Sequence, residues 1–191
     1  AADEEWMGSS AHAWPASQWS ALGNELGARA KVTTPNLASI MLLAEEGGRR
    51  VLLTGDGHWQ DILHGLERRG KLDPAGKLHV EVLKVQHHGS EHNIEQQFCD
   101  AITADHYVFC ANGEHANPDL RVVSLIAERR FAEGAGAPFT FWFNSHSSVA
   151  ETAAGRAHMS EVETLVGQLE QQSGGRLRSE SLLGDSFEVP V

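Results

Sequence analysis

Short apolar runs alternate with helical patterns along most of the chain. Residues 39–45 (SIMLLAE) and 50–55 (RVLLTG) are two such runs, separated by the turn Glu46-Gly47-Gly48, which is typical of a buried β-hairpin. Valine- and phenylalanine-rich runs predict further strands at residues 79–85, 106–111 and 139–144. The alternation therefore predicts an α/β domain in which successive strands are neighbours.

The helices are predicted from apolar residues that recur at helical spacing. In residues 58–70, Trp59, Ile62, Leu63 and Leu66 fall at i, i+3, i+4 and i+7, and Gly70 is a natural stop. Three more helices are expected: one at residues 94–102, one at 118–130 with Asn117 as N-cap and Pro118 as its first residue, and one at 160–172 opened by a capping box of Ser160 and Glu163.

Three stretches carry no strong pattern. Residues 1–34 indicate a loop and one short helix at 17–26, where Trp19, Leu22 and Leu26 share a face. Residues 145–158 indicate a long loop, and a break at Gly174-Gly175 precedes a tail.

Composition narrows the class of protein. The chain has 191 residues, 41% of them hydrophobic, which suffices for one compact domain, and a formal net charge of −11, which disfavours a basic face for nucleic acid. No apolar run approaches the roughly 20 residues that cross a bilayer, and the N-terminus lacks the features of a signal peptide. Cys99 and Cys110 lie in apolar patterns typical of reduced core residues. We expect a soluble, cytoplasmic protein.

Candidate chemistry lies in three polar clusters that follow apolar strands: TGDGH at residues 54–58, QHHGSEHN at 86–93 and ANGEH at 111–115. Strand ends with glycine-rich turns are places where side chains converge on a ligand. An aspartate with one or two histidines suits zinc, manganese or iron. Each residue also has an ordinary interpretation on its own: Asp56 as a helix N-cap, His87 and His88 as turn residues, and His92 as an exposed residue.

Taken together and in this order, the clusters resemble a known family. The segments NLASIMLLAEEGGRRVLLTGDGHWQDIL, LKVQHHGSEHN and ANGEHANPD resemble the C-terminal half of the metallo-β-lactamase-fold hydrolases, especially the soluble domain of competence-type DNA-uptake channels. The match covers about residues 35–130. It departs from the family pattern at Asn117, where the family usually has histidine before the proline.

The resemblance implies a fold and a site. The fold is an αββα sandwich, of which residues 35–172 would supply the C-terminal half as a mixed β-sheet with flanking helices, between an N-terminal segment (1–34) and a tail (173–191). Asp56 would bridge two metal ions, and His87 or His88 would be the last histidine ligand. The ions would be zinc, with manganese or iron as alternatives. If the strand stays extended, His87 shares a side with Leu83 and Val85, which favours His87.

Other residues would take roles around these ligands. Ser90 and Asn93 would line the pocket, and His58 would lie behind the ligands or at the entrance. Asn112 and His115 would face the substrate, a small-molecule or nucleic-acid phosphoester. Arg68, Arg69 and Lys71 are the candidates for a basic rim.

The family's main metal motif, H-x-H-x-D-H, is absent from the chain. A partner segment, either a second chain or a removed N-terminal half, would therefore complete a metal-dependent hydrolase. Two alternatives stay open: a non-catalytic scaffold or regulatory partner, and an α/β binding module in which Asp56, a histidine of the pair and Cys110 hold one structural metal. The metal hypothesis requires the side chains of Asp56 and of His87 or His88 to lie within about 5 Å of each other.

Overall fold

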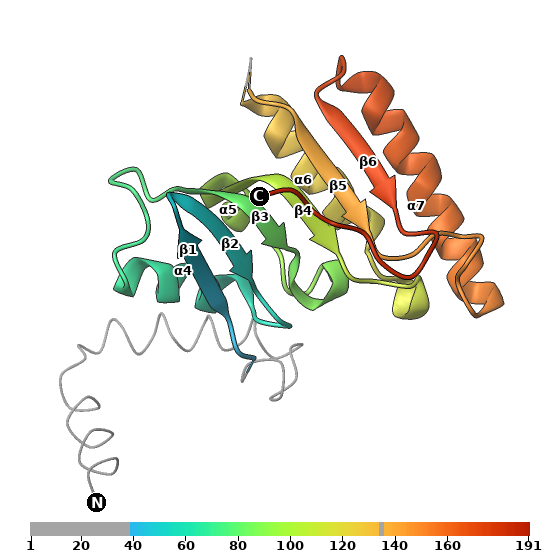
Figure 1. The fold of residues 1–191 in the computed structure, drawn as a ribbon, viewed down its shortest axis with the longest axis horizontal. Helices are drawn as coiled ribbons and strands as arrows, with labels where there is room; N and C mark the ends of the chain where they lie inside the picture. The colour runs from blue at the N-terminus through green and yellow to red at the C-terminus, as the bar shows by residue number, and fades with distance from the viewer. Residues whose placement is uncertain (1–38, 134–135) are drawn as a thin grey trace, which may run out of the picture. The chain divides into compact units, whose positions relative to one another are not determined.

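The computed structural model describes residues 39–133 and 136–191 (Figure 1). The short helix expected at residues 17–26 lies outside the described residues. Within them, six strands form one mixed sheet in chain order: β1 (Leu42–Glu46), β2 (Arg49–Leu53), β3 (Leu78–Lys84), β4 (Ile102–Phe109), β5 (Phe139–Phe143) and β6 (Leu177–Ser181). The helices are α4 (Trp59–Arg68), α5 (Gln96–Ala101), α6 (Leu120–Ala132) and α7 (Ala153–Gln172), with short 3-10 turns η1 (Gln86–Gly89) and η2 (Glu114–Ala116).

The strand directions place the polar clusters at one edge of the sheet. Strands β1 and β2 form the expected antiparallel hairpin, with Leu42 opposite Leu53 and Glu46 opposite Arg49. Each later strand pairs in parallel with the one before it. The turns that follow β2, β3, β4 and β5 therefore all leave the sheet at its carboxyl edge, where α/β proteins bind ligands.

The helices cover one face of the sheet. Leu52, Leu83, Tyr107 and Phe141 lie next to one another across β2 to β5, and all are at most 2% exposed. They belong to one buried cluster with apolar residues of α4, α5, α6 and α7. Figure 1 shows α4, α5 and α6 behind the strands in that view. Each such side chain contributes roughly 1.5–3 kcal/mol to stability by its burial.

The second face of the sheet carries a mixed row of side chains. Leu53, Lys84, Val108 and Trp142 are aligned across β2 to β5 on this face. The segment after β6 returns across it, and the ring of Phe187 lies 5.3 Å from that of Trp142 (Figure 1).

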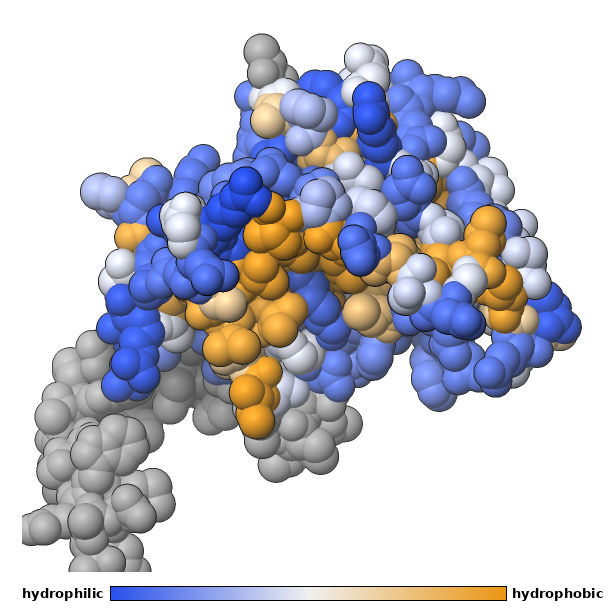
Figure 2. All heavy atoms as spheres, in the orientation of Figure 1, coloured by the Kyte–Doolittle hydropathy of each residue, from blue (hydrophilic) through white to orange (hydrophobic). Residues whose placement is uncertain are grey.

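Apolar side chains remain exposed where β1 and β2 form part of this second face. Figure 2 shows hydrophobic residues gathered over β1 and β2. Ile40 is 90% exposed, Leu42 53% and Leu53 42%. The described residues thus form one helix-covered sheet whose second face is only partly covered.

Two helix starts differ from the sequence expectation. Helix α7 begins at Ala153 with Thr152 as N-cap, whose hydroxyl accepts a hydrogen bond from the Gly155 amide, so the predicted capping box at Ser160 is wrong. The alanine-rich stretch before Ser160 has high helix propensity but too few apolar residues to show a periodic face. Glu163 instead accepts hydrogen bonds from the amide and hydroxyl of Ser147.

The start of α6 also moves. Asp119, and not Asn117, is its N-cap, and the peptide bond between Asn117 and Pro118 is cis. The Asp119 amide donates to the carbonyl of Gly89, and its carboxylate accepts from the Glu91 amide at 2.7 Å. Contacts to the turn after β3 therefore decide where this helix begins.

One strand is longer than predicted, and another was not predicted. The predicted helix at residues 94–102 ends at Ala101, and β4 begins at Ile102, four residues before the expected start at His106. The predicted tail contains β6, which pairs in parallel with β5, with Leu177 opposite Phe139. A largely polar edge strand such as LRSES has no apolar run to reveal it.

The turn after β4 packs against the start of α7 so closely that only glycine fits. Gly113 has φ +82°, and a Cβ there would lie 2.4 Å from the carbonyl oxygen of Gly155. We expect Gly113→Ala to destabilise the fold by about 1–2 kcal/mol for the left-handed backbone and about 1–3 kcal/mol more for overpacking. Gly174→Ala, at φ +63° with open space around it, should show only the backbone cost. Urea unfolding measures the loss of unfolding free energy in both variants, and equal losses would contradict close packing at Gly113.

The second sheet face gives stability a pH dependence through His106. Burial lowers the pKa of His106 below its ordinary 6.5, although Asp105 opposes the shift, and its Nδ1 accepts a hydrogen bond from Trp142 Nε1 at 3.0 Å. His106 therefore binds a proton more readily in the unfolded chain than in the folded one. The contribution of the neutral His106 to the stability of the fold is present above about pH 6.5 and is lost as the pH falls below it. His106→Gln should flatten the loss of stability between about pH 7.5 and 5. The exposed His64, replaced in the same way, should leave that slope unchanged.

Candidate functional site

The turn after β2 is held by contacts to three other segments. Buried Thr54 donates its hydroxyl proton to the carbonyl of Lys84. The Gly55 carbonyl accepts from the His87 amide at 3.0 Å and from Lys84 Nζ at 2.9 Å. The Asp56 amide donates to Ser39 Oγ at 3.1 Å. These contacts fix the backbone of Asp56 and leave its carboxylate 36% exposed.

His88 approaches this carboxylate from the turn after β3. Its Nε2 lies 3.8 Å from Asp56 Oδ1, which confirms the expected proximity of Asp56 to the histidine pair. The Nδ1 of His88 bonds to the backbone carbonyl of Cys110. Because a carbonyl only accepts, Nδ1 carries a proton, and Nε2 is the ring nitrogen that faces Asp56.

His87 has a different partner. Its Nδ1 lies 2.6 Å from the side-chain oxygen of Asn93. The argument that favoured His87 as ligand assumed an extended strand, and this premise is wrong because β3 ends at Lys84. Both histidines adopt the left-handed conformation, at φ 46° and 59°, so alternation no longer decides which side each faces. The geometry favours His88 as the ligand.

Asn93 ties the two turns together. It is completely buried, and its amide nitrogen donates to the carbonyls of Asp56 at 3.0 Å and Gly57 at 3.2 Å. Its backbone carbonyl accepts from the Trp59 amide. Asn93, expected to line a pocket, is instead buried between the turns and positions them.

Lys84 was not singled out from the sequence. Its side chain is 18% exposed, and Nζ lies 4.0 Å from Asp56 Oδ1. Burial lowers the pKa of Lys84, while Cys110 and the Asp56 carboxylate oppose the shift. The signal for it was a lysine within an apolar strand, which is a position where the charge needs a partner.

The remaining predicted residues separate into two groups. His58 is 3% exposed and is the N-cap of α4, accepting from the Gln60 amide at 3.4 Å, so it is not at an entrance and Asp56 is not the cap. Ser90 is also buried, within the turn. Asn112 and His115 are exposed and line a pocket.

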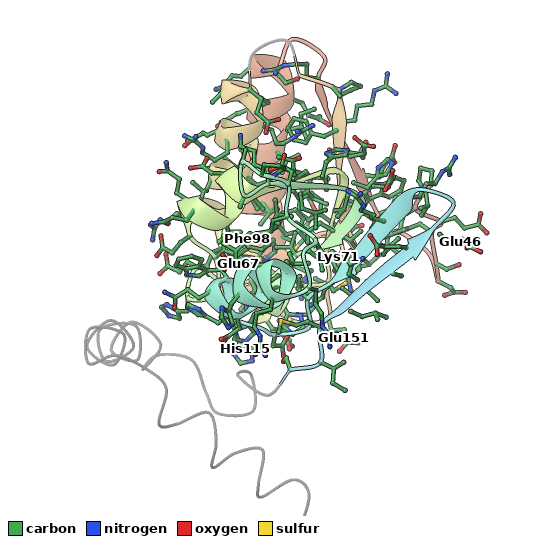
Figure 3. All side chains as sticks on the ribbon, turned by 90° about the vertical axis from the view of Figure 1, so that its left-hand side faces the viewer. Glu46, Glu67, Lys71, Phe98, His115 and Glu151 are labelled. Carbon is green, nitrogen blue, oxygen red and sulfur yellow. The ribbon has the colours of Figure 1, made fainter. Side chains whose placement is uncertain are left out.

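This pocket has a volume of about 360 Å³ and adjoins the Asp56–His88 pair, because His88 is one of its walls. The other lining residues come from the turns after β4 and β5: Cys110, Ala111, Asn112, Glu114, His115, Asn117 and Asn144. Figure 3 places His115 at the lower end of the molecule, the end toward which the parallel strands point in Figure 1.

The predicted basic rim lies elsewhere. Lys71 pairs with Glu45 beside the β1–β2 hairpin. Arg69 and Lys71 line a separate groove with Met41 and Leu42, between the hairpin and α4. Figure 3 shows Lys71 on the hairpin side of the sheet and His115 below it.

Two donor atoms, one from Asp56 and one from His88, lie close enough to reach the same metal ion. Two atoms that each bind zinc at about 2 Å lie at most about 4 Å apart, and Asp56 Oδ1 and His88 Nε2 meet this condition. The bond from His88 Nδ1 to a carbonyl is the arrangement that commonly orients a metal-binding histidine. Within residues 39–133 and 136–191, however, no group of three or more His, Cys, Asp or Glu side chains is placed to hold a metal.

Comparisons with known proteins add no relative. A scan of family models finds no match to the chain, and searches of curated proteins and of solved structures find none either. In the part of the chain that the structure describes, no helix combines the length and apolarity needed to span a membrane. The class that the fold defines is an α/β protein with a six-stranded mixed sheet flanked by helices.

Removing the Asn93 side chain should loosen both turns. Asn93→Ala leaves the carbonyls of Asp56 and Gly57 and one nitrogen of His87 without this partner, so we expect a loss of about 2–4 kcal/mol in the free energy of unfolding. The exposed Asn144, replaced by alanine, should cost under about 0.5 kcal/mol. Urea unfolding of both variants measures the difference, and similar values would show that Asn93 does not hold the turns.

Proposed function

We propose that this chain is the C-terminal half of a metallo-β-lactamase-like hydrolase that cleaves phosphoester or phosphodiester bonds with a binuclear metal site. One observation carries the proposal. His88 donates its Nδ1 proton to the Cys110 carbonyl, and its Nε2 is turned toward Asp56 Oδ1, 3.8 Å away.

In this proposal Asp56 and His88 hold metal at the carboxyl edge of the sheet. Zinc is the first choice for a carboxylate with imidazole, and manganese and iron are the alternatives. Two bound ions would supply a hydroxide at neutral pH and neutralise charge on a phosphoester in the transition state. Lys84, tied to the Gly55 carbonyl, keeps the Asp56 turn in place, and Asn93 holds it from the other side.

The remaining ligands would come from a segment that carries H-x-H-x-D-H. The second face of the sheet supports a partner of this kind, because it presents Leu53, Val108 and exposed Leu42 along β1, β2 and β4. Exposed apolar surface of this sort commonly marks an interface. A partner lying there would border the same carboxyl edge as Asp56.

The alternative is a scaffold that keeps the turns without the chemistry. It is favoured by one observation: the contacts that hold both turns come from within the chain. Thr54 bonds to Lys84, and Asn93 bonds to Asp56 and Gly57. The turns therefore do not need a metal ion to keep their shape.

Paramagnetic broadening by Mn²⁺ separates the two functions, since it detects even weak binding to the chain alone. We expect Mn²⁺ to broaden the amide signals of residues 55–58 and 87–89 first. Asp56→Asn and His88→Ala should each weaken this effect at least tenfold, because each removes one of two ligands. His92→Ala, an exposed histidine of the same turn, is the matched control and should change little.

Broadening centred on another region, such as Glu45 and Glu46, would refute the metal site and favour the scaffold. Activity is tested on the completed complex. With a polypeptide carrying H-x-H-x-D-H, bis(p-nitrophenyl) phosphate should be hydrolysed in a manner that requires Asp56 and His88. A stable, metal-loaded complex without hydrolysis would exclude phosphoester cleavage.

A further inference from the structure

The pocket beside the Asp56–His88 pair has an unusual set of polar groups for a phosphate site. Three amide side chains, those of Asn112, Asn117 and Asn144, line it together with the imidazoles of His88 and His115. Glu114 contributes a carboxylate. Among the lining residues that the structure describes there is no lysine or arginine.

This wall selects against a polyanion. Phosphate oxygens in a diester only accept hydrogen bonds, so they cannot satisfy the Glu114 carboxylate or the amide oxygens, and they are repelled by the carboxylate charge. Hydroxyl and ring N–H groups can donate to these oxygens, and hydroxyl oxygens can also accept from the amide nitrogens. Asn112 illustrates the second role, since its oxygen already accepts from the Glu114 amide at 3.1 Å and its NH₂ group remains as a donor.

We propose that this pocket binds an uncharged, hydroxyl-bearing organic group of nucleoside or monosaccharide size, the organic part of a phosphoester whose single phosphate lies at Asp56 and His88. The inference rests on the proposed function for the position of the phosphate. The volume of about 360 Å³ falls in the range of small-molecule pockets. His88 belongs both to the pocket wall and to the Asp56 pair, so one ligand can reach both.

The substrate class is therefore a compact phosphoester with one phosphate group. A long nucleic-acid strand is disfavoured, because a second phosphate in this pocket would meet the charge of Glu114. The net charge of −11 opposes such a strand as well.

Ligand titration followed by amide chemical shifts tests the pocket without the metal. In EDTA, uridine and methyl glucoside are each compared with uridine 5′-monophosphate and with inorganic phosphate. We expect uridine or methyl glucoside to shift the signals of residues 110–117 and 144. The one that binds more tightly shows whether the organic part of the substrate is a nucleoside or a sugar. The monophosphate should bind no more tightly than uridine.

Three variants connect the binding to named groups. Asn144→Ala should weaken binding of the uncharged ligand by about 2–10-fold, through the loss of one hydrogen bond. Glu114→Gln should strengthen the monophosphate relative to uridine by a few-fold, because it removes a like charge. Glu128→Gln, an exposed carboxylate on α6, carries the same charge change away from the pocket and should alter neither.

The outcomes separate this inference from the proposed function. Tighter binding of the monophosphate or of inorganic phosphate than of uridine in EDTA would overturn the inference, and so would the absence of shifts with either uncharged ligand. Replacing EDTA with Zn²⁺ should then tighten the binding of the monophosphate and leave the binding of uridine unchanged. If Zn²⁺ has no effect while the uncharged ligand still binds, the metal site fails and the pocket stands.

Discussion

The structure depends on the burial of four helices against one face of a sheet whose strands lie in chain order. Because each parallel strand joins the sheet beside its predecessor, crossovers of one hand leave every helix on the same side. The apolar row from Leu52 to Phe141 supplies the core on that side. All the turns that end the parallel strands then reach a single edge. The site and the half-covered second face are both consequences of this arrangement.

At that edge, hydrogen bonds between turns replace regular secondary structure as the source of order. Gly55 and Asn93 link the turns after β2 and β3, and Cys110 links the latter to the turn after β4. The left-handed backbone at His87 and His88 costs of order 1–3 kcal/mol per residue, and such cost persists only where surrounding contacts enforce it. The hydrogen bonds of Asn93 and of the Cys110 carbonyl are the contacts that maintain this strain.

In the proposed function, the pocket and the two proposed metal ligands would make different demands on a substrate. Asp56 and His88 suit a cation that attracts a phosphate, whereas Glu114 and the neighbouring amides suit an uncharged, hydrogen-bonding group. A single compact phosphoester satisfies both. The second sheet face makes a separate demand, since exposed leucines on β1 and β2 would be stabilised by a covering partner. The proposed substrate and the proposed partner would thus occupy different surfaces of the protein.

The sequence by itself determined the positions of strands β1 to β5, the hairpin and the edge at which Asp56 and the histidine pair converge, because apolar runs and glycine-rich turns are local signals. It could not identify His88 over His87, since that choice depends on a left-handed turn stabilised by Asn93 and the distant Cys110 carbonyl. The first residues of helix α7, before Ser160, and strand β6 were not predicted for a related reason: alanine-rich and polar stretches acquire their structure from the neighbours against which they pack. Only the tertiary structure decided which polar groups line the pocket, because they come from the separate turns after β3, β4 and β5, whose spacing is fixed by the shared core.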